Sequence, residues 1–452
     1  MITRYRPRII EAFWLTLLIL YAASGMKITP FHGDEAMHIY TSRDYAIAFI
    51  NRQPEQLLVV PPFDMDSTPR LRLLNGSVMR YSVGLSWHLA GLAENDLPPR
   101  PGWDWGMFYD QNVETGHRPT EPLLFAARTV AVIYLALSII AIYGIGTYFG
   151  GRLTAFIVSA LYTFNPIILL NGRRALVESA LLCFALLLIL VTLHIVRQRE
   201  QHGKTRWYAW LALILASTLT LASKYSGTVL VAGAFGGIFA AECFRVCFRA
   251  GQQTIVARLK MLLKPVSALI VSGLLTILLL IVISPAFWSD PINRARDLAV
   301  MLQEQVEVVV SIQPDAPTTI PQRIEDIITQ PFLRSPQFFE QASWADAAPI
   351  TAEIEHYMAS PLSGIQWGVI FGSVLTLLAL VGTVATLWPR LRPYDSYSVS
   401  IVLWVCLLLM LANLLVNPLP WQRYYLAYIP LVGLLSAVGI TALLQQFRPK
   451  IT

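Results

Sequence analysis

The 452-residue sequence has little charge and few cysteines. Only 14% of its residues are charged, 55% are hydrophobic, and the mean hydropathy is +0.54. Soluble domains carry about 25% charged residues, so this composition excludes an assembly of soluble domains as well as disordered and collagen-like chains. The four cysteines all lie in or beside apolar stretches, which excludes a disulfide scaffold.

The sequence instead contains long apolar runs. About 20 residues of helix cross the roughly 30 Å hydrocarbon core of a bilayer. We therefore predict an all-α polytopic membrane protein, a single domain over 1–452 with about 10 transmembrane helices and no separate soluble C-terminal domain. The expected spans are 9–25, 122–148, 153–170, 175–196, 207–223, 226–243, 265–284, 364–387, 397–417 and 424–444.

The positions of the charges predict the orientation of these spans. One set of connecting segments carries 17 bases and 3 acids, whereas two long loops are acidic: residues 26–121 hold 8 bases and 12 acids, and residues 285–363 hold 4 and 11. Basic segments stay in the cytoplasm, so we expect both termini to be cytoplasmic and both long loops to be extracytoplasmic. The net charge of +6 is thus an orientation signal, and no nucleic-acid partner is expected.

The ionisable groups in or beside the spans collect near their outer ends. Ionisable residues at membrane depth are costly and indicate function, yet no acid is expected at the midplane, where an ion-coupled transporter would need one. The pattern predicts a site at the outer membrane face. The outer groups are Arg128, Arg173, Arg174, Glu178, Lys224 and Arg423.

An acidic pair, Asp34 and Glu35, opens a predicted interfacial helix over 36–50. Two interpretations of the pair stay open. An acid at a helix N-terminus can cap the helix and interact with its dipole. Alternatively, a carboxylate held at the membrane surface can accept a proton.

The bases form a complementary set. Arg174 and Glu178 are four residues apart, a spacing that lets two side chains share one helix face, and Lys224 and Arg423 lie in outer turns. Each base alone is also explained by snorkelling to the interface. Together they predict a phosphate site, because guanidinium groups bind phosphate through paired hydrogen bonds.

A carboxylate facing bases at the membrane surface suits one reaction. The acid deprotonates an acceptor hydroxyl, which attacks the anomeric carbon of a sugar carried on a polyprenyl phosphate. The bases stabilise the charge that develops on the departing lipid phosphate. Such a donor is confined to the interface by its apolar tail.

The order and sidedness of these features resemble the GT-C superfamily of membrane glycosyltransferases, and are similar to the protein O-mannosyltransferases and the lipid A aminoarabinose transferases. The resemblance begins with an outer loop that opens with Asp-Glu, followed by a Gly-rich amphipathic stretch. The motifs that carry it are Asp34-Glu35, residues 76–92, Arg128, Arg174 with Glu178, Ser223-Lys224-Tyr225-Ser226-Gly227, residues 285–291 and Arg423-Tyr424.

The resemblance implies roles for individual residues. Asp34 is similar to the catalytic base of the family, with Glu35 as its support. The residues that it implies for the substrate and the lipid phosphate are Arg80, Arg128, Arg173, Arg174, Glu178, Lys224, Tyr225, Asp290, Arg423 and Tyr424. The chain departs from the family at 70–76, where many relatives carry Lys-Pro-Pro or His-Pro-Pro, and residues 94–121 look like an insertion that shapes the acceptor entrance.

These observations predict an integral-membrane glycosyltransferase. Its partners are a polyprenyl-phosphate-linked sugar donor, an acceptor hydroxyl on a glycan, lipid or protein, and membrane lipids. No cofactor is expected to be required; a divalent metal held by His32 and His38 is the alternative. A polyprenyl-lipid transporter or flippase and a non-catalytic cell-envelope assembly protein are the rival functions.

Overall fold

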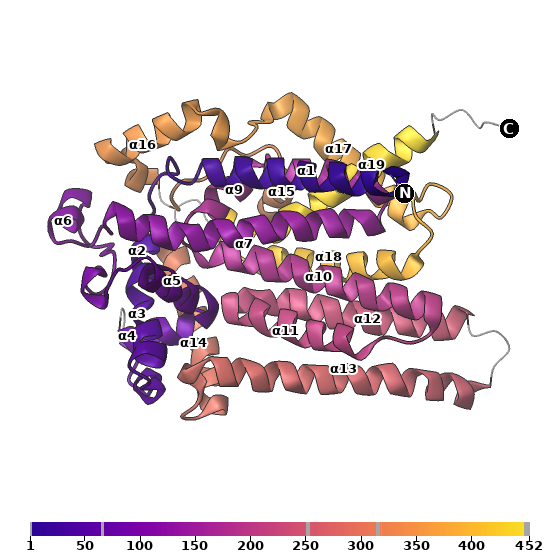
Figure 1. Ribbon diagram of the computed structural model, residues 1–452, viewed down its shortest axis with the longest axis horizontal. Helices are drawn as coiled ribbons and strands as arrows, with labels where there is room; N and C mark the ends of the chain where they lie inside the picture. Colours follow the sequence, from indigo (N-terminus) through magenta and orange to yellow (C-terminus); the bar gives the residue numbers. More distant parts are fainter. Residues whose placement is uncertain are drawn as a thin grey trace.

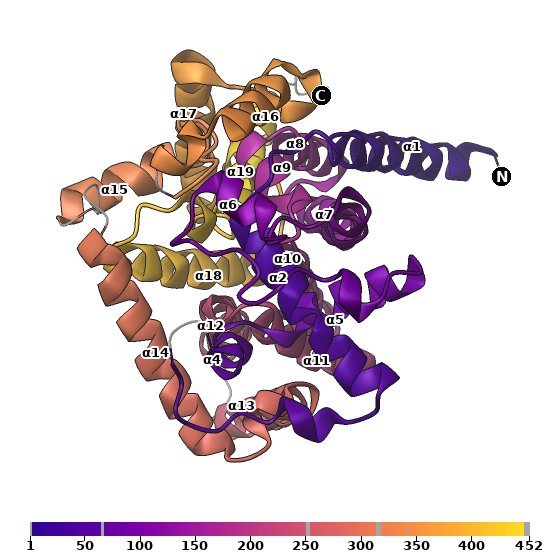
Figure 2. The ribbon, with the colours of Figure 1, turned by 90° about the vertical axis from the view of Figure 1, so that its left-hand side faces the viewer.

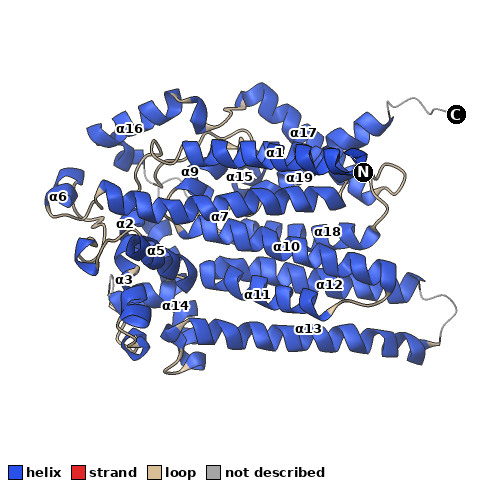
Figure 3. Cartoon of the chain, viewed as in Figure 1, coloured by secondary structure: helices blue, strands red, loops and turns tan. Residues whose placement is uncertain are grey.

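The computed structural model describes residues 2–64, 67–249, 254–312, 317, 319–340 and 342–446. Over these residues the chain is helical and contains no strand (Figure 3). The all-α fold predicted from the apolar runs is confirmed. The chain is a multi-pass integral membrane protein.

Long helices run side by side along the molecule (Figure 1). The bundle consists of α1 (Ile2–Ser24), α7 (Glu121–Tyr148), α8 (Gly151–Thr163), α9 (Pro166–Arg173), α10 (Val177–His202), α11 (Trp207–Ser223), α12 (Thr228–Arg249), α13 (Ile255–Ile283), α17 (Gly368–Leu387), α18 (Tyr397–Val416) and α19 (Ile429–Gln446). Each of the ten expected spans coincides with one of these helices or with the pair α8 and α9.

Length and composition support most of these spans. Among the described residues seven helices are long and apolar enough to cross a membrane, or eight if one bent pair counts as a single span. Helices α1 and α11 coincide with the other two expected spans, but α11 has only 17 residues. The exact count of ten stays a prediction.

The bent pair corrects one expectation. The apolar run at 153–170 predicts one continuous span, but α8 and α9 meet at 64°. Pro166 occupies the first turn of α9, and Asn165 caps it by accepting from the amides of Ile167 and Ile168. Proline is tolerated at a helix start and disfavoured in its interior, so the local sequence ends one helix and begins another.

The two long loops gather at one end of the bundle, opposite the start of α1 and the end of α19 (Figures 1 and 2). The first loop holds α2 (Gly33–Thr41), α3 (Arg43–Tyr45), η1 (Ala46–Ile50), α4 (Thr68–Leu74), α5 (Ser77–Leu89) and α6 (Tyr109–Glu114); the second holds α14 (Pro291–Ile312), α15 (Ile320–Thr329) and α16 (Ala348–Ala359). The predicted interfacial helix is present as the nearly continuous run α2–α3–η1, and the amphipathic stretch 76–92 contains α5.

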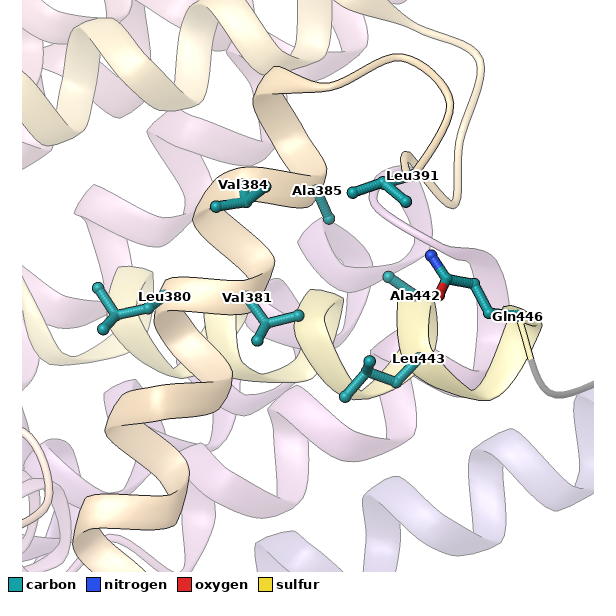
Figure 4. Close-up of a pocket in the computed structure, with 8 residues that line it drawn as sticks. All are labelled: Leu380, Val381, Val384, Ala385, Leu391, Ala442, Leu443 and Gln446. Carbon is teal, nitrogen blue, oxygen red and sulfur yellow. The ribbon is translucent and has the colours of Figure 1, made fainter.

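An apolar groove of about 280 Å³ lies between α17 and α19, toward the end away from the long loops (Figure 4). Gln446 is the one polar side chain among the eight residues that line it. Because none of the described residues that line this groove is ionisable, they offer none of the acid–base or phosphate chemistry expected of the site.

Helices α17 and α19 pack closely because glycines face each other. A Cβ added at Gly439 would overlap the carbonyl oxygen of Leu378, and one added at Gly382 would overlap that of Leu435. Small residues let helix backbones approach in membranes, where packing replaces the hydrophobic driving force. This contact fixes the position of the last helix, which follows directly after the turn that carries Arg423.

We expect Gly439→Ala to destabilise the protein by about 1–3 kcal/mol, because the new methyl group forces the two backbones apart. Gly433→Ala is the matched control on the same helix, since a Cβ at Gly433 meets open space, and it should leave stability unchanged or raise it slightly. Thermal unfolding in detergent measures both. Equal effects of the two substitutions would contradict the proposed packing.

Candidate active site

Two residues other than Asp34 cap the N-terminus of α2. The Nδ1 atom of His32 accepts from the amide of Asp34 at 3.1 Å, and the carboxylate of Glu35 accepts from the amide of His32 at 3.0 Å. These two bonds form a capping box. The capping interpretation of the acidic pair therefore holds for Glu35, and the side chain of Asp34 is directed to other contacts.

Glu35 is fully buried and saturated with hydrogen bonds. Arg128 of α7 donates to it from Nε and Nη2, both at 2.7 Å, and the amide of Ala175 donates at 2.9 Å. Burial raises the pKa of the Glu35 carboxyl, but Arg128 and the other donors outweigh burial and the pKa lies below its usual value. Glu35 thus joins α2, α7 and the turn before α10, and has no oxygen open to substrate.

The side chain of Asp34 is partly exposed and lies beside a basic side chain. Its Oδ2 accepts from Nη1 of Arg423 at 2.6 Å, across 389 positions of sequence, and 16% of its side chain is exposed. The other carboxylate oxygen, Oδ1, has no hydrogen-bond partner among the residues the structure describes. Asp34 is therefore anchored through one oxygen and available through the other.

Arg423 is shared between two carboxylates. Its Nε lies 3.0 Å from Oε1 of Glu340, and Oε2 of Glu340 accepts from Nε2 of His32 at 3.0 Å. Burial raises the pKa of Glu340, but Arg423 and then His32 more than offset it, so the pKa lies well below its usual range. Burial lowers the pKa of Arg423, and Glu340, Asp34 and Glu178 together raise it well above its usual value.

A glutamine pair holds the Arg423 turn against the second loop. The backbone amides of Gln337 and Gln422 each donate to the side-chain oxygen of the other residue at 2.8 Å. Gln422 also donates to Gln330 at 3.0 Å. The reciprocal bonds fix the distance between the turn before α19 and residues 335–340, and so bring Arg423 to Glu340.

Lys224 forms the second basic position. Its Nζ lies 2.7 Å from Glu178 and 5.0 Å from the ring centre of Tyr424, the residue after Arg423. Glu178 therefore pairs with Lys224 rather than with Arg174. The helix-face spacing predicted for Arg174 and Glu178 does not apply, because α10 begins at Val177 and Arg174 lies in an extended segment before it.

The paired arginines 173 and 174 bind mainly backbone carbonyl oxygens. Arg173 donates to those of Ala22, Tyr21 and Leu362 and to the hydroxyl of Tyr357. Arg174 donates to those of Pro30 and Phe338, which leaves its Nη2 buried without a hydrogen-bond partner in the described part of the chain. Burial lowers the pKa of Arg174 to about 10, although nearby Glu35 opposes the change.

Arg80 and Tyr225 line a separate small cleft with Ser77 and Asn75. Arg80 donates to Asp44 at 2.8 Å, and Asp44 also binds Arg72.

This cleft is electrostatically linked to the Asp34 cluster through His38. Burial lowers the pKa of His38 to about 4 against the influence of Asp34 and Glu178, with Arg423 and Arg80 acting in the same sense as burial, so its imidazole is neutral at physiological pH.

The structure does not bring every predicted residue to this cluster. Asp290 accepts from the amide and side chain of Asn293 at the start of α14, which lowers the pKa of its carboxyl.

The two ring nitrogens of His32, a candidate metal ligand, both contact protein groups. Within the described residues, no group of three or more His, Cys, Asp or Glu side chains is placed to hold a metal ion.

Sequence reasoning missed two members of the cluster. Glu340 carries no local signal in the sequence, because it is one acid among several in an irregular loop. The sequence suggests His32 only as a metal ligand, yet its ring connects the α2 N-terminus to Glu340. Its position two residues before Asp34 in a Gly-containing turn was the available clue.

Comparison with known proteins supports the family resemblance. The model of the family "dolichyl-phosphate-mannose-protein mannosyltransferase" matches residues 106–288. The matched region contains Arg128, Arg174, Glu178 and Lys224, whereas Asp34 and Arg423 lie outside it. A search of curated proteins finds no match.

Solved structures of an archaeal oligosaccharyltransferase share the fold. The apo enzyme from Archaeoglobus fulgidus superposes with a TM-score of 0.53 at 11% identity, over 97% of this chain and 51% of that one. The same organism's AglB in complex with an inhibitory peptide and a dolichol-phosphate gives 0.51 at 11% identity, over 96% and 51%. The chain has the GT-C fold.

The sequence-based resemblance to GT-C glycosyltransferases is thereby confirmed. The chain spans about half the length of these oligosaccharyltransferases. ArnT from Cupriavidus metallidurans, bound to undecaprenyl phosphate, also matches, with 14% identity, 96% of this chain, 77% of that chain and a TM-score of 0.37.

We expect Glu35→Gln to destabilise the protein by about 3–5 kcal/mol, because it leaves Arg128 buried without its counter-charge. The control is Glu121→Gln in the same loop, whose side chain is 80% exposed and 3.8 Å from its basic partner. Thermal unfolding in detergent compares the two. Normal stability of the Glu35 variant would show that this pair does not hold the loop to α7.

Proposed function

We propose that the chain is a glycosyltransferase that moves a sugar from a polyprenyl-phosphate donor to an acceptor hydroxyl at the extracytoplasmic membrane face. The family match and the GT-C fold support the reaction class. The main support for the proposal is the geometry of Asp34, a partly exposed carboxylate with one oxygen bound to Arg423 and the other open. This is the geometry that a general base needs.

The proposed mechanism begins at the open oxygen. Oδ1 of Asp34 accepts the proton of the acceptor hydroxyl as the hydroxyl oxygen bonds to the anomeric carbon. The bond between that carbon and the phosphate oxygen breaks, and its electron pair leaves with the lipid phosphate. The contact of Oδ2 with Arg423 fixes the direction in which Oδ1 points, so the base needs little reorganisation during the reaction.

Arg423 and Lys224 are the proposed contacts of the departing phosphate. Arg423 uses Nη1 on Asp34 and Nε on Glu340, and a guanidinium group has five N–H donors in all. Lys224 has three donors and uses one on Glu178. Since Lys224 lies over the ring of Tyr424, both cations flank the same short turn and can meet one phosphate from two sides.

A flippase or a non-catalytic assembly protein would use the same bases differently. A flippase needs polar groups along the path of the headgroup through the bilayer. The ion pairs near the spans cluster instead at their ends, as with Glu178 and Lys224 at one end and Glu242 with Arg199 at the other. An assembly protein does not need the open oxygen of Asp34.

We expect Asp34→Asn to reduce sugar transfer by about 10²–10⁴-fold, the usual contribution of a general base. Stability should remain near wild type, because His32 and Glu35 cap α2. Transfer of radiolabelled sugar from a panel of polyprenyl-phosphate donors by the purified protein measures the effect. Asp110→Asn, an exposed change in the same loop, is the matched control.

Other outcomes of this experiment separate the rival functions. Full activity of the Asp34 variant would exclude Asp34 as the base. Movement of the lipid between leaflets without sugar transfer would support the flippase. Loss of folding in the variant would assign Asp34 a structural role.

We expect Arg423→Met to weaken binding of polyprenyl phosphate by at least about tenfold, because a charge-assisted hydrogen bond is lost. A ligand that binds only the folded state raises thermal stability in proportion to its affinity, so the shift in unfolding temperature on adding sugar-free polyprenyl phosphate reports binding. Arg334→Met, at a half-exposed arginine of the second loop, is the control. The same shift in both variants would argue against Arg423 as a phosphate contact.

A further inference from the structure

An aromatic cavity of about 450 Å³ opens beside the Asp34 cluster. Its walls come from the start of α2, from residues 103–109 of the first loop and from residues 339–350 of the second. The rings that define it are Phe31, Trp103, Trp105, Tyr109, Phe339 and Trp344. The volume and the mainly apolar lining with a few polar groups are those of small-molecule sites.

The cavity shares its wall with the proposed catalytic base. Gly33, the residue before Asp34, lines it, and so does Phe339, the residue before Glu340. Phe339 also stacks on His32 with ring centres 5.1 Å apart. A molecule in the cavity therefore lies directly next to the groups that hold Asp34.

Hydrogen bonds on both loops hold the walls in place. Glu353 of α16 binds Arg118 at 2.8 Å and the amide of Phe31 at 2.8 Å. The amide of Asp104 donates to the fully buried side chain of Asn112, which donates back to the Asp104 carbonyl oxygen, both at 2.9 Å. The site is preformed, so a ligand would not have to order it.

The ring geometry and the polar groups of the lining indicate the chemistry of the ligand. Trp105 and Trp344 meet at 87° with centres 4.6 Å apart, so the wall presents ring faces in more than one direction. The phenol of Tyr109 and the carboxylate of Asp346 also belong to the lining, so the cavity combines apolar ring faces with a few polar groups.

The charge of the lining disfavours an anionic ligand. Among the described lining residues Asp346 is the one carboxylate, and none is Lys or Arg. Arg118 lies against the rings of Phe31 and Tyr109, but its charge is paired with Glu353. A neutral sugar ring offers C–H faces to the aromatic rings and hydroxyl protons to Asp346.

We propose that this cavity binds a neutral sugar residue of the acceptor, so that the acceptor is a glycan or the carbohydrate part of a glycolipid. The inference rests on the proposed function for its place in the reaction, because the sugar in the cavity presents its hydroxyl to Asp34. Binding itself requires no donor and no transfer.

The test measures saccharide binding without any donor. Purified protein in lipid nanodiscs is titrated with neutral di- and trisaccharides of glucose, mannose and galactose, and tryptophan fluorescence is recorded. We expect at least one saccharide to change the fluorescence saturably. Trp105→Ala and Trp344→Ala should each weaken its binding about tenfold, whereas Trp207→Ala, at a side chain 75% exposed at the start of α11, should not.

Short N-acetylated Ser and Thr peptides with one Phe or Leu residue serve as the competing ligand class. A saturable fluorescence change with these peptides and none with any saccharide overturns the proposal in favour of a peptide acceptor. Saccharide binding that is unchanged in both cavity variants also overturns it. In a parallel transfer assay, sugar transfer without saccharide binding would sink this inference and leave the proposed function intact, whereas binding without transfer from any donor would do the reverse.

Discussion

The buried carboxylate of Glu35 is the contact on which the candidate site depends. Arg128 of α7, the amide of Ala175 and the amide of His32 all donate to it, and Arg128 also binds the carbonyl oxygens of Met26 and Thr29. One charge pair thereby fixes the end of α1, the start of α2 and the turn before α10. An ion pair this deeply buried is stable only when its remaining donors and acceptors are satisfied, and here they are.

That contact also explains why two adjacent acids behave differently. Successive residues of a helix point about 100° apart, so once Glu35 faces the core, Asp34 must face the second loop and the turn before α19. There it meets Arg423, which Gln337 and Gln422 hold in place. Glu35 positions the helix, and Asp34 is the acid left with an open oxygen.

The sequence predicted the elements better than their contacts. Apolar runs determine membrane helices directly, and the acidic pair marked the start of α2. Arg174 and Glu178 show the limit of such reasoning: their spacing suggested a shared helix face, but α10 starts at Val177 and Glu178 binds Lys224 instead. The role of Glu340 cannot be predicted from the sequence for a related reason. Its partners, Arg423 and His32, lie more than 80 and more than 300 residues away along the chain, and only the folded loops bring them together.

Groups of different chemistry lie near Asp34. Arg423 and Lys224 flank the aromatic turn at Tyr424, whereas Trp105 and Trp344 belong to an aromatic cavity that Gly33, the residue before Asp34, also lines. A transferase must hold a charged leaving group and an incoming hydroxyl at opposite ends of one displacement. As the proposed base, Asp34 has a cationic group and an aromatic surface as neighbours, and each of these surfaces disfavours the other's ligand. The combination of bases, carboxylate and aromatic rings therefore supports the proposed group transfer more strongly than any one of these residues does alone.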